Sequence, residues 1–350
     1  MQVAEQGLQP KWSPNGRLAL IWGETEPDYS WLLRVIDPTG ALPAQQVNLG
    51  YQKSLFIDRW LDHGRLSLVV HRGTSAEDLV EVNILEGTIT QLVGIEAGTL
   101  TTTTIGAAYH WSPELQFLVI ERPKAVLPGQ ISLLEVATGA VTDLAQWEEP
   151  RHQRFEAWAP DTRQFLYEQW GEPNSPMLEA APHLLVWDVA TRQGRELLPN
   201  VWGAAWSSTD QIAFLLLGNP TQNDEGRIVA TDFQPGQPFA LFLGMMDATT
   251  QEVGTLLPLG QVTDAAAFRN GAAFAQREVA WCGTPRPVWS PDSSQLVYGD
   301  AEGRLWLLTA EGQQLRLPTS QHVAWSQDSK WLAIRTVEEV VVVCTKRETC

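Results

Sequence analysis

The chain has 350 residues, a formal net charge of −17 and an apolar fraction of 44%. Its length exceeds the roughly 250–300 residues of a single compact core, so we expect either two domains or one fold built by repetition. The composition argues against a disordered chain, and the acid excess argues against a nucleic-acid partner, because phosphate binding needs a basic surface.

The N-terminal residues 1–16 carry neither the basic segment nor the apolar run of a secretory signal. No stretch reaches the roughly 18 apolar residues of a membrane-spanning helix, so we expect no membrane insertion. Two locations stay open. The protein is cytoplasmic if Met1 is the native start, and periplasmic or extracellular if the chain has been trimmed.

One motif recurs along the chain: a Trp, a turn rich in Ser, Pro, Asp, Asn and Gly, and then a run of aliphatic residues. It begins at Trp12, Trp60, Trp111, Trp158, Trp206, Trp289 and Trp325. The motif therefore accounts for seven of the sixteen Trp residues. Because each of the seven has the same place in the repeat, we expect them to belong to the core.

Each repeat predicts four short antiparallel strands. The motif turn suits a tight hairpin, and the runs around it are rich in strand-forming residues. Second strands are expected at 18–22, 66–71, 117–121, 165–168 and 296–298, and third strands at 31–37, 79–85, 131–137, 183–190, 239–247, 304–310 and 340–345. A further turn then leads into a fourth strand. Four strands in a unit of about 50 residues are typical of a β-propeller blade.

The turn Trp-Ser-Pro-Asp at 289–292, an apolar strand, and a later turn such as Val-Ile-Asp-Pro-Thr-Gly at 35–40 resemble the repeats of TolB-type and WD-repeat propellers. The resemblance covers nearly the whole chain. The full WD signature is absent, since only Trp187-Asp188 carries the Trp-Asp pair, so the TolB type is the closer match. The resemblance implies the fold and says little about function, because the motif residues are structural.

We therefore expect a single all-β domain over residues 1–350, a seven-bladed propeller of four-stranded antiparallel blades. The last repeat lacks a fourth strand, so we predict that residues 2–6 supply it and close the ring. An eighth blade stays open as an alternative, because Trp206 and Trp289 are 83 residues apart with a faint echo of the hairpin at 267–274. Residues 264–277 carry the one helix-like pattern.

Cys282, Cys344 and Cys350 are too few for a disulfide framework and lack the spacing of a zinc site. We expect free thiols, with Cys344 buried in a strand. A bridge from Cys344 to Cys350 or to Cys282 is the alternative if the protein is exported.

Three long segments interrupt the repeats, at 171–182, 218–238 and 259–287. With the strands of a blade lettered A to D, all three are B–C or D–A connections of blades four to six, and these lie on one face. Long loops on a rigid scaffold often carry binding residues. We predict a binding surface containing Trp170, Glu172, Asn223, Asp224, Glu225, Arg227, Arg269, Arg277, Trp281 and Arg286. Structural readings stay open: a solvated turn at 223–226, salt bridges for the arginines, and packing between blades for Trp170, Trp202 and Trp281.

The familiar catalytic and metal-binding motifs are absent, and the six His residues are scattered without ligand spacing, so each His is assigned a structural role. We expect no metal, no cofactor and a monomeric, non-catalytic scaffold that binds a protein or peptide through the long loops of blades four to six. Two alternatives stay open. One is an enzyme or small-ligand binder (glycan or lactone) that uses the central channel, although the A strands offer few polar side chains there. The other is the propeller domain of a larger peptidase or sensor.

Overall fold

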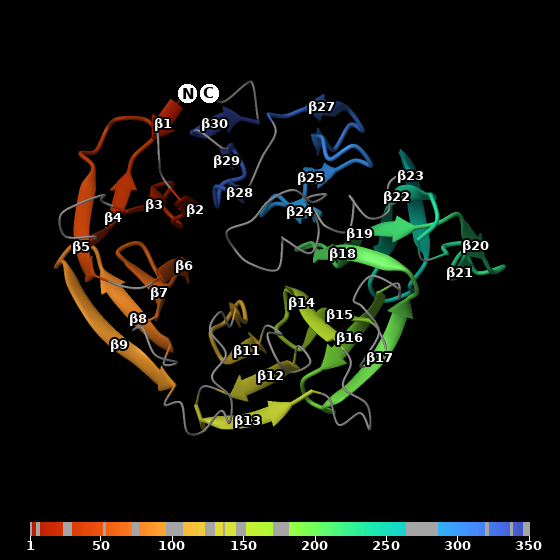
Figure 1. Ribbon diagram of the computed structural model, residues 1–350, viewed down its shortest axis with the longest axis horizontal. Coiled ribbons are helices and arrows are strands. Elements are labelled where there is room, and N and C mark those ends of the chain that lie inside the picture. Colours follow the sequence, from red (N-terminus) through yellow and green to blue (C-terminus); the bar gives the residue numbers. More distant parts are fainter. Residues whose placement is uncertain are drawn as a thin grey trace. The chain divides into compact units, whose positions relative to one another are not determined.

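The structure is a computed structural model. It describes residues 2–4, 8–23, 30–51, 54–71, 77–95, 108–122, 130–135, 137–144, 152–170, 182–234, 236–263, 286–318, 322–336 and 339–345. These residues form strands and turns and no helix. The strands make seven four-stranded antiparallel sheets and one two-stranded sheet (Figure 1). The chain divides into two compact units, one of Met1–Ile105 with Pro318–Cys350 and one of Gly106–Leu317.

The first unit holds three of the sheets. Two follow the chain order: β2 (Leu8–Trp12), β3 (Leu18–Gly23), β4 (Ser30–Ile36) and β5 (Gln45–Tyr51), then β6 (Ser54–Trp60), β7 (Arg65–His71), β8 (Glu77–Asn83) and β9 (Thr88–Ile95). The third joins the two ends of the chain: β28 (His322–Trp325), β29 (Trp331–Arg335), β30 (Val340–Cys344) and, outermost, β1 (Gln2–Ala4). Ala4 pairs with Val340, and β1 is labelled beside β30 in Figure 1. The N-terminal strand thus occupies the predicted place in the last sheet, and closure of the ring by it stays a prediction.

The second unit holds the other four sheets. They are β10 (Ala108–Trp111), β11 (Phe117–Arg122), β12 (Gln130–Glu135) and β13 (Ala140–Asp143); β14 (His152–Trp158), β15 (Gln164–Trp170), β16 (His183–Asp188) and β17 (Gln193–Leu198); β18 (Val201–Trp206), β19 (Gln211–Leu217), β22 (Phe239–Asp247) and β23 (Val253–Val262); and β24 (Val288–Trp289), β25 (Leu296–Gly299), β26 (Leu305–Leu308) and β27 (Gln314–Arg316). The two-stranded sheet is a hairpin of β20 (Pro220–Gln222) and β21 (Ile228–Thr231). The predicted all-β fold of seven four-stranded blades is confirmed.

The two insertions differ from the expected long loops. The segment 218–238 contains the β20–β21 hairpin, and β23 continues to Val262, so the first residues of the segment 259–287 are strand. The hairpin echo at 267–274, the helical pattern at 264–277 and most of the segment 171–182 lie outside the described residues.

Alternating side chains of a strand pack against the two neighbouring sheets. Ile212, Phe214 and Leu216 of β19 belong to a cluster with Leu166, Leu184 and Val186 of the preceding sheet. The residues between them, Ala213, Leu215 and Leu217, belong to a cluster with Leu296 and Tyr298 of the following sheet. A strand that is buried on both faces explains why these runs are continuously apolar rather than alternating.

The serine of the motif holds the hairpin turn. Its Oγ accepts the backbone N–H that begins the next strand at 2.8–3.0 Å, with Arg17, Phe117, Gln211, Gln295 and Trp331 donating to Ser13, Ser112, Ser207, Ser290 and Ser326. The fourth residue after the motif Trp has a left-handed φ in six repeats, at Gly16, Leu115, Thr162, Asp210, Ser293 and Ser329. In the five repeats with this serine, the turn therefore depends on one hydroxyl and one left-handed residue; Leu61 and Ala159 take the place of the serine in the other two.

The motif Trp also joins successive sheets. Nε1 of Trp60 donates to the carbonyl of Lys11 at 3.0 Å, and Nε1 of Trp158 donates to the carbonyl of His110 at 2.9 Å. Each acceptor directly precedes the motif Trp of the preceding sheet. The core assignment is right for Trp12, Trp60 and Trp325, whereas Trp111, Trp158, Trp206 and Trp289 are half-buried.

Cys344 is half-buried in β30 and is disulfide-bonded. The expectation of a free, buried thiol at this position was therefore wrong. The sequence could not decide the point because it did not show which cysteines the fold brings together. Cys282 and Cys350 lie outside the described residues.

Candidate functional site

The residues predicted for a binding surface fall in different places. Four lie at the tip of the β20–β21 hairpin: Asn223, Asp224, Glu225 and Arg227. Arg286 lies elsewhere, in a buried charged cluster, and Trp170 is the last residue of β15. The remaining four, Glu172, Arg269, Arg277 and Trp281, lie outside the described residues.

The β20–β21 hairpin is fixed to its sheet at its base. Asp232 accepts the backbone N–H of Asn219 at 2.6 Å and its side-chain amide at 2.8 Å, and these bonds lower the pKa of Asp232. Gly218 has a φ of 84°, and a Cβ there would lie 2.5 Å from the backbone nitrogen of Phe233. Only glycine allows the backbone at 218 to come this close to the Phe233 backbone, so this contact fixes the conformation at the base of the hairpin.

Apolar and backbone contacts hold the rest of the hairpin. Ile228 is 4% exposed and belongs to the core cluster of its sheet, and Phe233 packs edge-on against Phe239 with ring centroids 5.1 Å apart. Near the tip, the carbonyl of Gly226 accepts the N–H of Val253 at 3.3 Å, which ties the turn to the start of β23. The hairpin is a built part of the blade rather than a loose loop.

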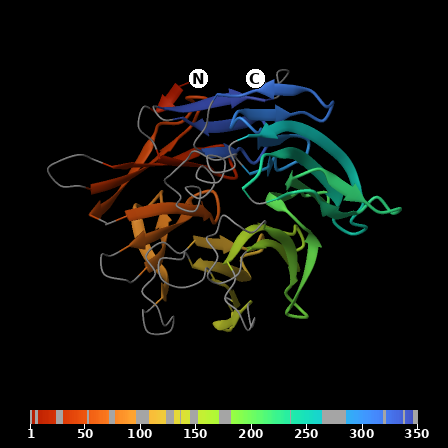
Figure 2. The same ribbon diagram turned by 45° about the vertical axis from the view of Figure 1, so that its right-hand side comes forward.

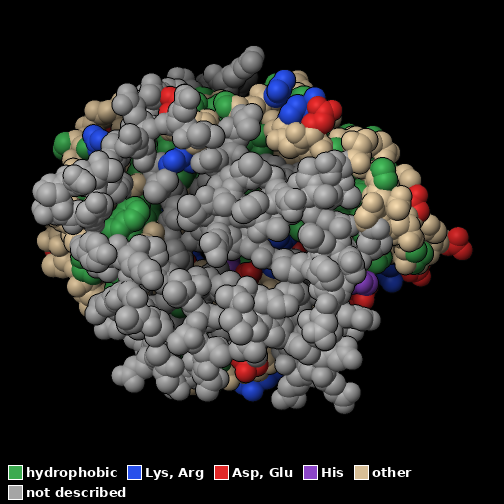
Figure 3. All heavy atoms as spheres, in the orientation of Figure 1, with side chains coloured by type: hydrophobic (Ala, Val, Ile, Leu, Met, Phe, Trp, Pro, Cys, Tyr) green, Lys and Arg blue, Asp and Glu red, His purple; other side chains and the backbone are tan. Residues whose placement is uncertain are grey.

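The tip of the hairpin presents exposed acidic and apolar side chains. The Asn223 side chain closes the turn by accepting the N–H of Arg227 at 2.9 Å, which leaves Asp224 and Glu225 exposed. Val229 on β21 is 55% exposed. Figures 1 and 2 show the hairpin projecting from the strands of its sheet, and Figure 3 shows acidic side chains at that edge.

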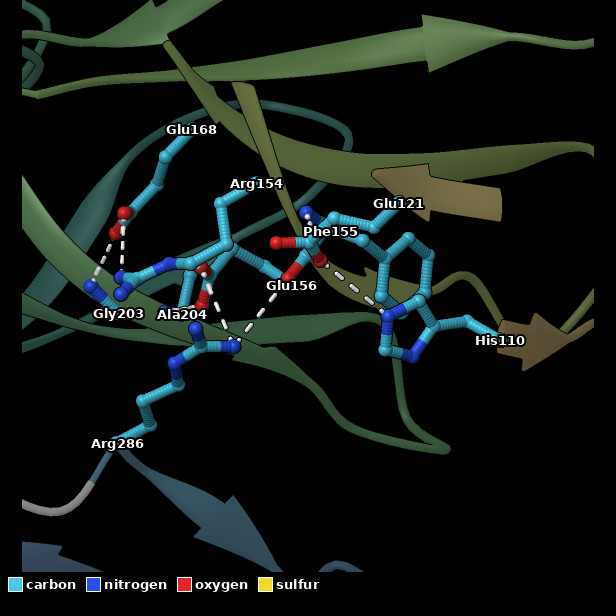
Figure 4. Close-up of polar contacts among 9 residues, drawn as sticks. All are labelled: His110, Glu121, Arg154, Phe155, Glu156, Glu168, Gly203, Ala204 and Arg286. Atoms are coloured by element: carbon cyan, nitrogen blue, oxygen red, sulfur yellow. Dashed lines mark hydrogen bonds and ion pairs between the residues drawn. The ribbon is translucent and has the colours of Figure 1, made fainter. Parts of the chain in front are cut away.

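A second feature is a charged cluster on the first and second strands of neighbouring sheets (Figure 4). β14 and β18 are edge strands of their sheets, so backbone N–H groups on their open side have no neighbouring strand to donate to. Glutamate side chains accept these hydrogen bonds. Glu121 accepts the N–H of Phe155 at 3.2 Å, Glu156 accepts that of Ala204 at 3.0 Å, and Glu168 accepts that of Gly203.

Register shifts in β14 and β18 bring the side chains and backbone groups of the cluster close to one another. The register of β14 shifts between Phe155 and Ala157, and that of β18 shifts between Val201 and Ala204. Gly203, inside the second shift, has a φ of 77°. A Cβ at Gly203 would also lie 3.0 Å from Cγ of Arg286, so glycine meets both the dihedral and the close approach.

Arg154 is the centre of the cluster. Its Nε donates to Glu156 at 2.8 Å, its Nη2 donates to Glu168 at 2.5 Å, and its guanidinium lies 5.1 Å from the ring centroid of Trp202. The side chains of Arg154, Glu156 and Glu168 are 3%, 0% and 0% exposed. Removing one member would leave an unpaired buried charge, which costs about 3–5 kcal/mol in proteins. Trp202 itself is half-buried and packs against the core cluster shared by its own sheet and the next, which favours the packing interpretation.

Burial and charge act on the titrating groups in opposite directions. Burial raises the pKa of Glu168 to about 7, and Glu156 adds to this effect while Arg154 and Arg286 oppose it. Burial would also raise the pKa of Glu121, but the contact with His110 and the charges of Arg286 and Arg154 lower it overall. Glu168 therefore takes up a proton more readily than Glu121 does.

The accessible side of the cluster is formed by Arg286, His110 and Glu121, whose side chains are 32%, 29% and 21% exposed. Nη1 of Arg286 lies 3.5 Å from Oε1 of Glu156 and donates to the carbonyl of Phe155 at 3.3 Å. The His110 ring stacks on Phe155 with centroids 4.3 Å apart, and its Nε2 is 3.4 Å from Oε2 of Glu121. All three side chains thus contact Phe155 or its backbone.

Of this cluster, the sequence analysis identified only Arg286 as a site residue. The available signal was a charge inside an otherwise apolar strand: Glu121 follows Leu-Val-Ile, and Glu168 follows Phe-Leu-Tyr. Charged residues are rarely buried unless they are paired, so such positions predict a polar network. Its partners come from other repeats, and spacing along the chain does not show them.

Among the described residues, no group of three or more His, Cys, Asp or Glu side chains is arranged to hold a metal ion. No helix in that part of the chain is long and apolar enough to cross a membrane.

No protein-family model and no curated protein matches the sequence. Solved structures do match. A Dos1 propeller aligns with a TM-score of 0.53 and 10% identity over 97% of this chain and 92% of its own, and a chain of a mitotic checkpoint complex aligns with a TM-score of 0.53 and 13% identity over 97% and 89%. The fold is a β-propeller. TolB from Acinetobacter baumannii aligns with a TM-score of 0.47 and 14% identity over 88% of this chain, which spans 65% of that structure. The two alignments with a TM-score of 0.53 confirm the expected propeller fold.

Proposed function

We propose that this propeller is a non-catalytic scaffold that binds a protein or peptide through the β20–β21 hairpin. The observation that carries the proposal is the hairpin itself: an insertion anchored by Asn219–Asp232, Ile228 and Phe233 that leaves Asp224, Glu225 and Val229 exposed. A preordered element binds with less loss of conformational entropy than a loose loop does.

The charge of the protein indicates the chemistry of the partner. The chain has a net charge of −17, and its hairpin tip carries Asp224 and Glu225, of which Glu225 lies 3.3 Å from Arg227. A partner segment with Lys or Arg residues around an apolar side chain would complement the tip and Val229. Electrostatic complementarity of this kind raises the association rate more than the affinity, so the interaction would weaken at high salt.

A site-specific crosslink tests the proposal. A photoreactive amino acid replaces Val229, and the matched control replaces Leu315, an exposed residue of β27 in the same unit. The protein crosslinked at position 229 is identified by mass spectrometry and purified, and its Kd is measured for the native chain and for a variant with a short turn in place of 218–238. We expect crosslinking at position 229 alone and at least a tenfold weaker Kd for the variant. Equal crosslinking at both positions, or an unchanged Kd, would refute the hairpin assignment.

A further inference from the structure

The charged cluster has unused hydrogen-bonding groups on its accessible side. In the part of the chain that the structure describes, the Arg286 guanidinium makes its contacts through Nη1, which leaves Nε and Nη2 available. Nε2 of His110 is buried and faces Oε2 of Glu121 at 3.4 Å, so it is not open to a ligand. Glu121 uses Oε2 for both of its contacts, so Oε1 is available as well.

We propose that Nε and Nη2 of Arg286 bind the carboxylate of a ligand, and that Glu121 accepts an N–H or O–H group next to that carboxylate. The ligand class is an α-hydroxy or N-acylated α-amino acid, which includes the C-terminus of a polypeptide. A guanidinium presents parallel N–H groups that match the two oxygens of a carboxylate. This site is separate from the hairpin of the proposed function and does not depend on it.

The buried part of the cluster fixes the groups that would meet the ligand. Nη1 of Arg286 is held by Glu156 and by the Phe155 carbonyl, and the Phe155 N–H holds Glu121. His110 stacks on the Phe155 ring and supports Glu121 from the side, and Figure 4 draws these side chains around Phe155. Groups already held in place lose little entropy when a ligand binds, which favours binding.

The charge balance admits an anionic ligand. Glu121, Glu156 and Glu168 face Arg154 and Arg286, so the five groups sum to −1 when every carboxylate is ionised and to zero when Glu168 is protonated. Because the pKa of Glu168 is raised to about 7, the cluster is close to neutral in the range around that pH. A carboxylate would favour the protonated cluster, so binding should take up protons and strengthen as the pH falls from 8 to 6.

Calorimetric titration with four probes tests the proposal. The probes are N-acetylalanine, N-acetyl-trialanine and the C-terminal amide of each. We expect each acid to bind saturably. Each amide should bind at least roughly tenfold more weakly than its acid, because the amide lacks the charged acceptor. Preference for the longer acid would indicate a polypeptide C-terminus, and equal binding would indicate a small carboxylic acid.

Variants connect the binding to the named residues. Arg286→Ala should weaken binding of the acids roughly tenfold or more, and Arg286→Lys should restore part of it. Arg163→Ala, at an arginine whose side chain is 82% exposed, is the matched control and should bind as the native chain does. Circular dichroism of each variant verifies folding. No saturation by either acid at about 10 mM, or undiminished binding by a folded Arg286→Ala variant, would overturn the proposal.

Discussion

The indole Nε1 of Trp12 donates a hydrogen bond to the carbonyl of Ala324 at 2.8 Å, across 312 residues of sequence. The contact joins the first repeat to the last within one unit of the structure. It follows the same rule as the bonds from Trp60 to Lys11 and from Trp158 to His110, since each acceptor directly precedes a motif Trp. Trp12, Trp60 and Trp158 therefore act as joints between neighbouring blades, whereas Nε1 of Trp111, Trp206 and Trp289 has no hydrogen-bond partner in the described residues.

The joint can be tested by replacing Trp with Phe, which keeps an aromatic ring and removes the N–H. We expect Trp158→Phe to lower the free energy of unfolding by about 1–3 kcal/mol more than Trp206→Phe does, because it also leaves the His110 carbonyl without its donor. Trp206 is the matched control, since it is a half-buried motif Trp whose Nε1 lacks a hydrogen-bond partner in the described residues. Urea denaturation of both variants measures the difference, and equal losses would contradict the joint.

The N-terminal strand provides a second test. Deletion of residues 1–7 removes β1 and exposes the outer edge of β30. We expect the Tm to fall by roughly 5 °C or more, because a paired edge of the last sheet is lost. Adding a peptide of residues 1–7 should recover part of the loss, and an unchanged Tm after deletion would contradict closure by this strand.

Glu168 should make stability depend on pH. Its pKa rises from 4.5 to about 7 in the folded state. A raised pKa favours folding below the unfolded value, and this contribution is lost as the pH rises through about 7, by at most about 3 kcal/mol. Between pH 5 and 8 the native chain should therefore lose stability relative to Glu168→Gln, whose amide does not titrate. Glu121, with a lowered pKa, acts in a more acidic range. Parallel pH profiles of the two proteins would show that Glu168 does not titrate in this window.

The left-handed residue of the motif turn predicts a difference between two glycines. Gly16 has a φ of 80°, and neither Gly16 nor Gly254 has an atom within 4 Å of the position that a Cβ would occupy. Gly16→Ala should lower the free energy of unfolding by about 1 kcal/mol, since the cost is purely conformational. Gly254→Ala, in β23, should be neutral or stabilising by up to about 1 kcal/mol. Chemical denaturation measures both, and a similar loss at both sites would contradict the turn argument.

The repeat made the fold predictable. Its period, its turn residues and its apolar runs are local features, and β22 has the bounds expected for its strand, 239–247. The charged cluster was not predictable in the same way. Arg154, Glu168 and Gly203 come from two blades and meet through strand irregularities that leave no period in the sequence. The hairpin was predictable in part. The sequence predicted an insertion at 218–238, but the contacts of Ile228 and Phe233 that order it form only in the folded blade.

The indole joint has a consequence for how such a chain can grow and diverge. Its acceptor is a main-chain oxygen, which any amino acid supplies, and Lys11, His110 and Ala324 indeed have little in common chemically. A copy of one of these three repeats would therefore bring both a donor and an acceptor with it. Mutation of the residue that supplies the carbonyl would then leave the link intact, provided that the tryptophan is kept and the backbone does not move.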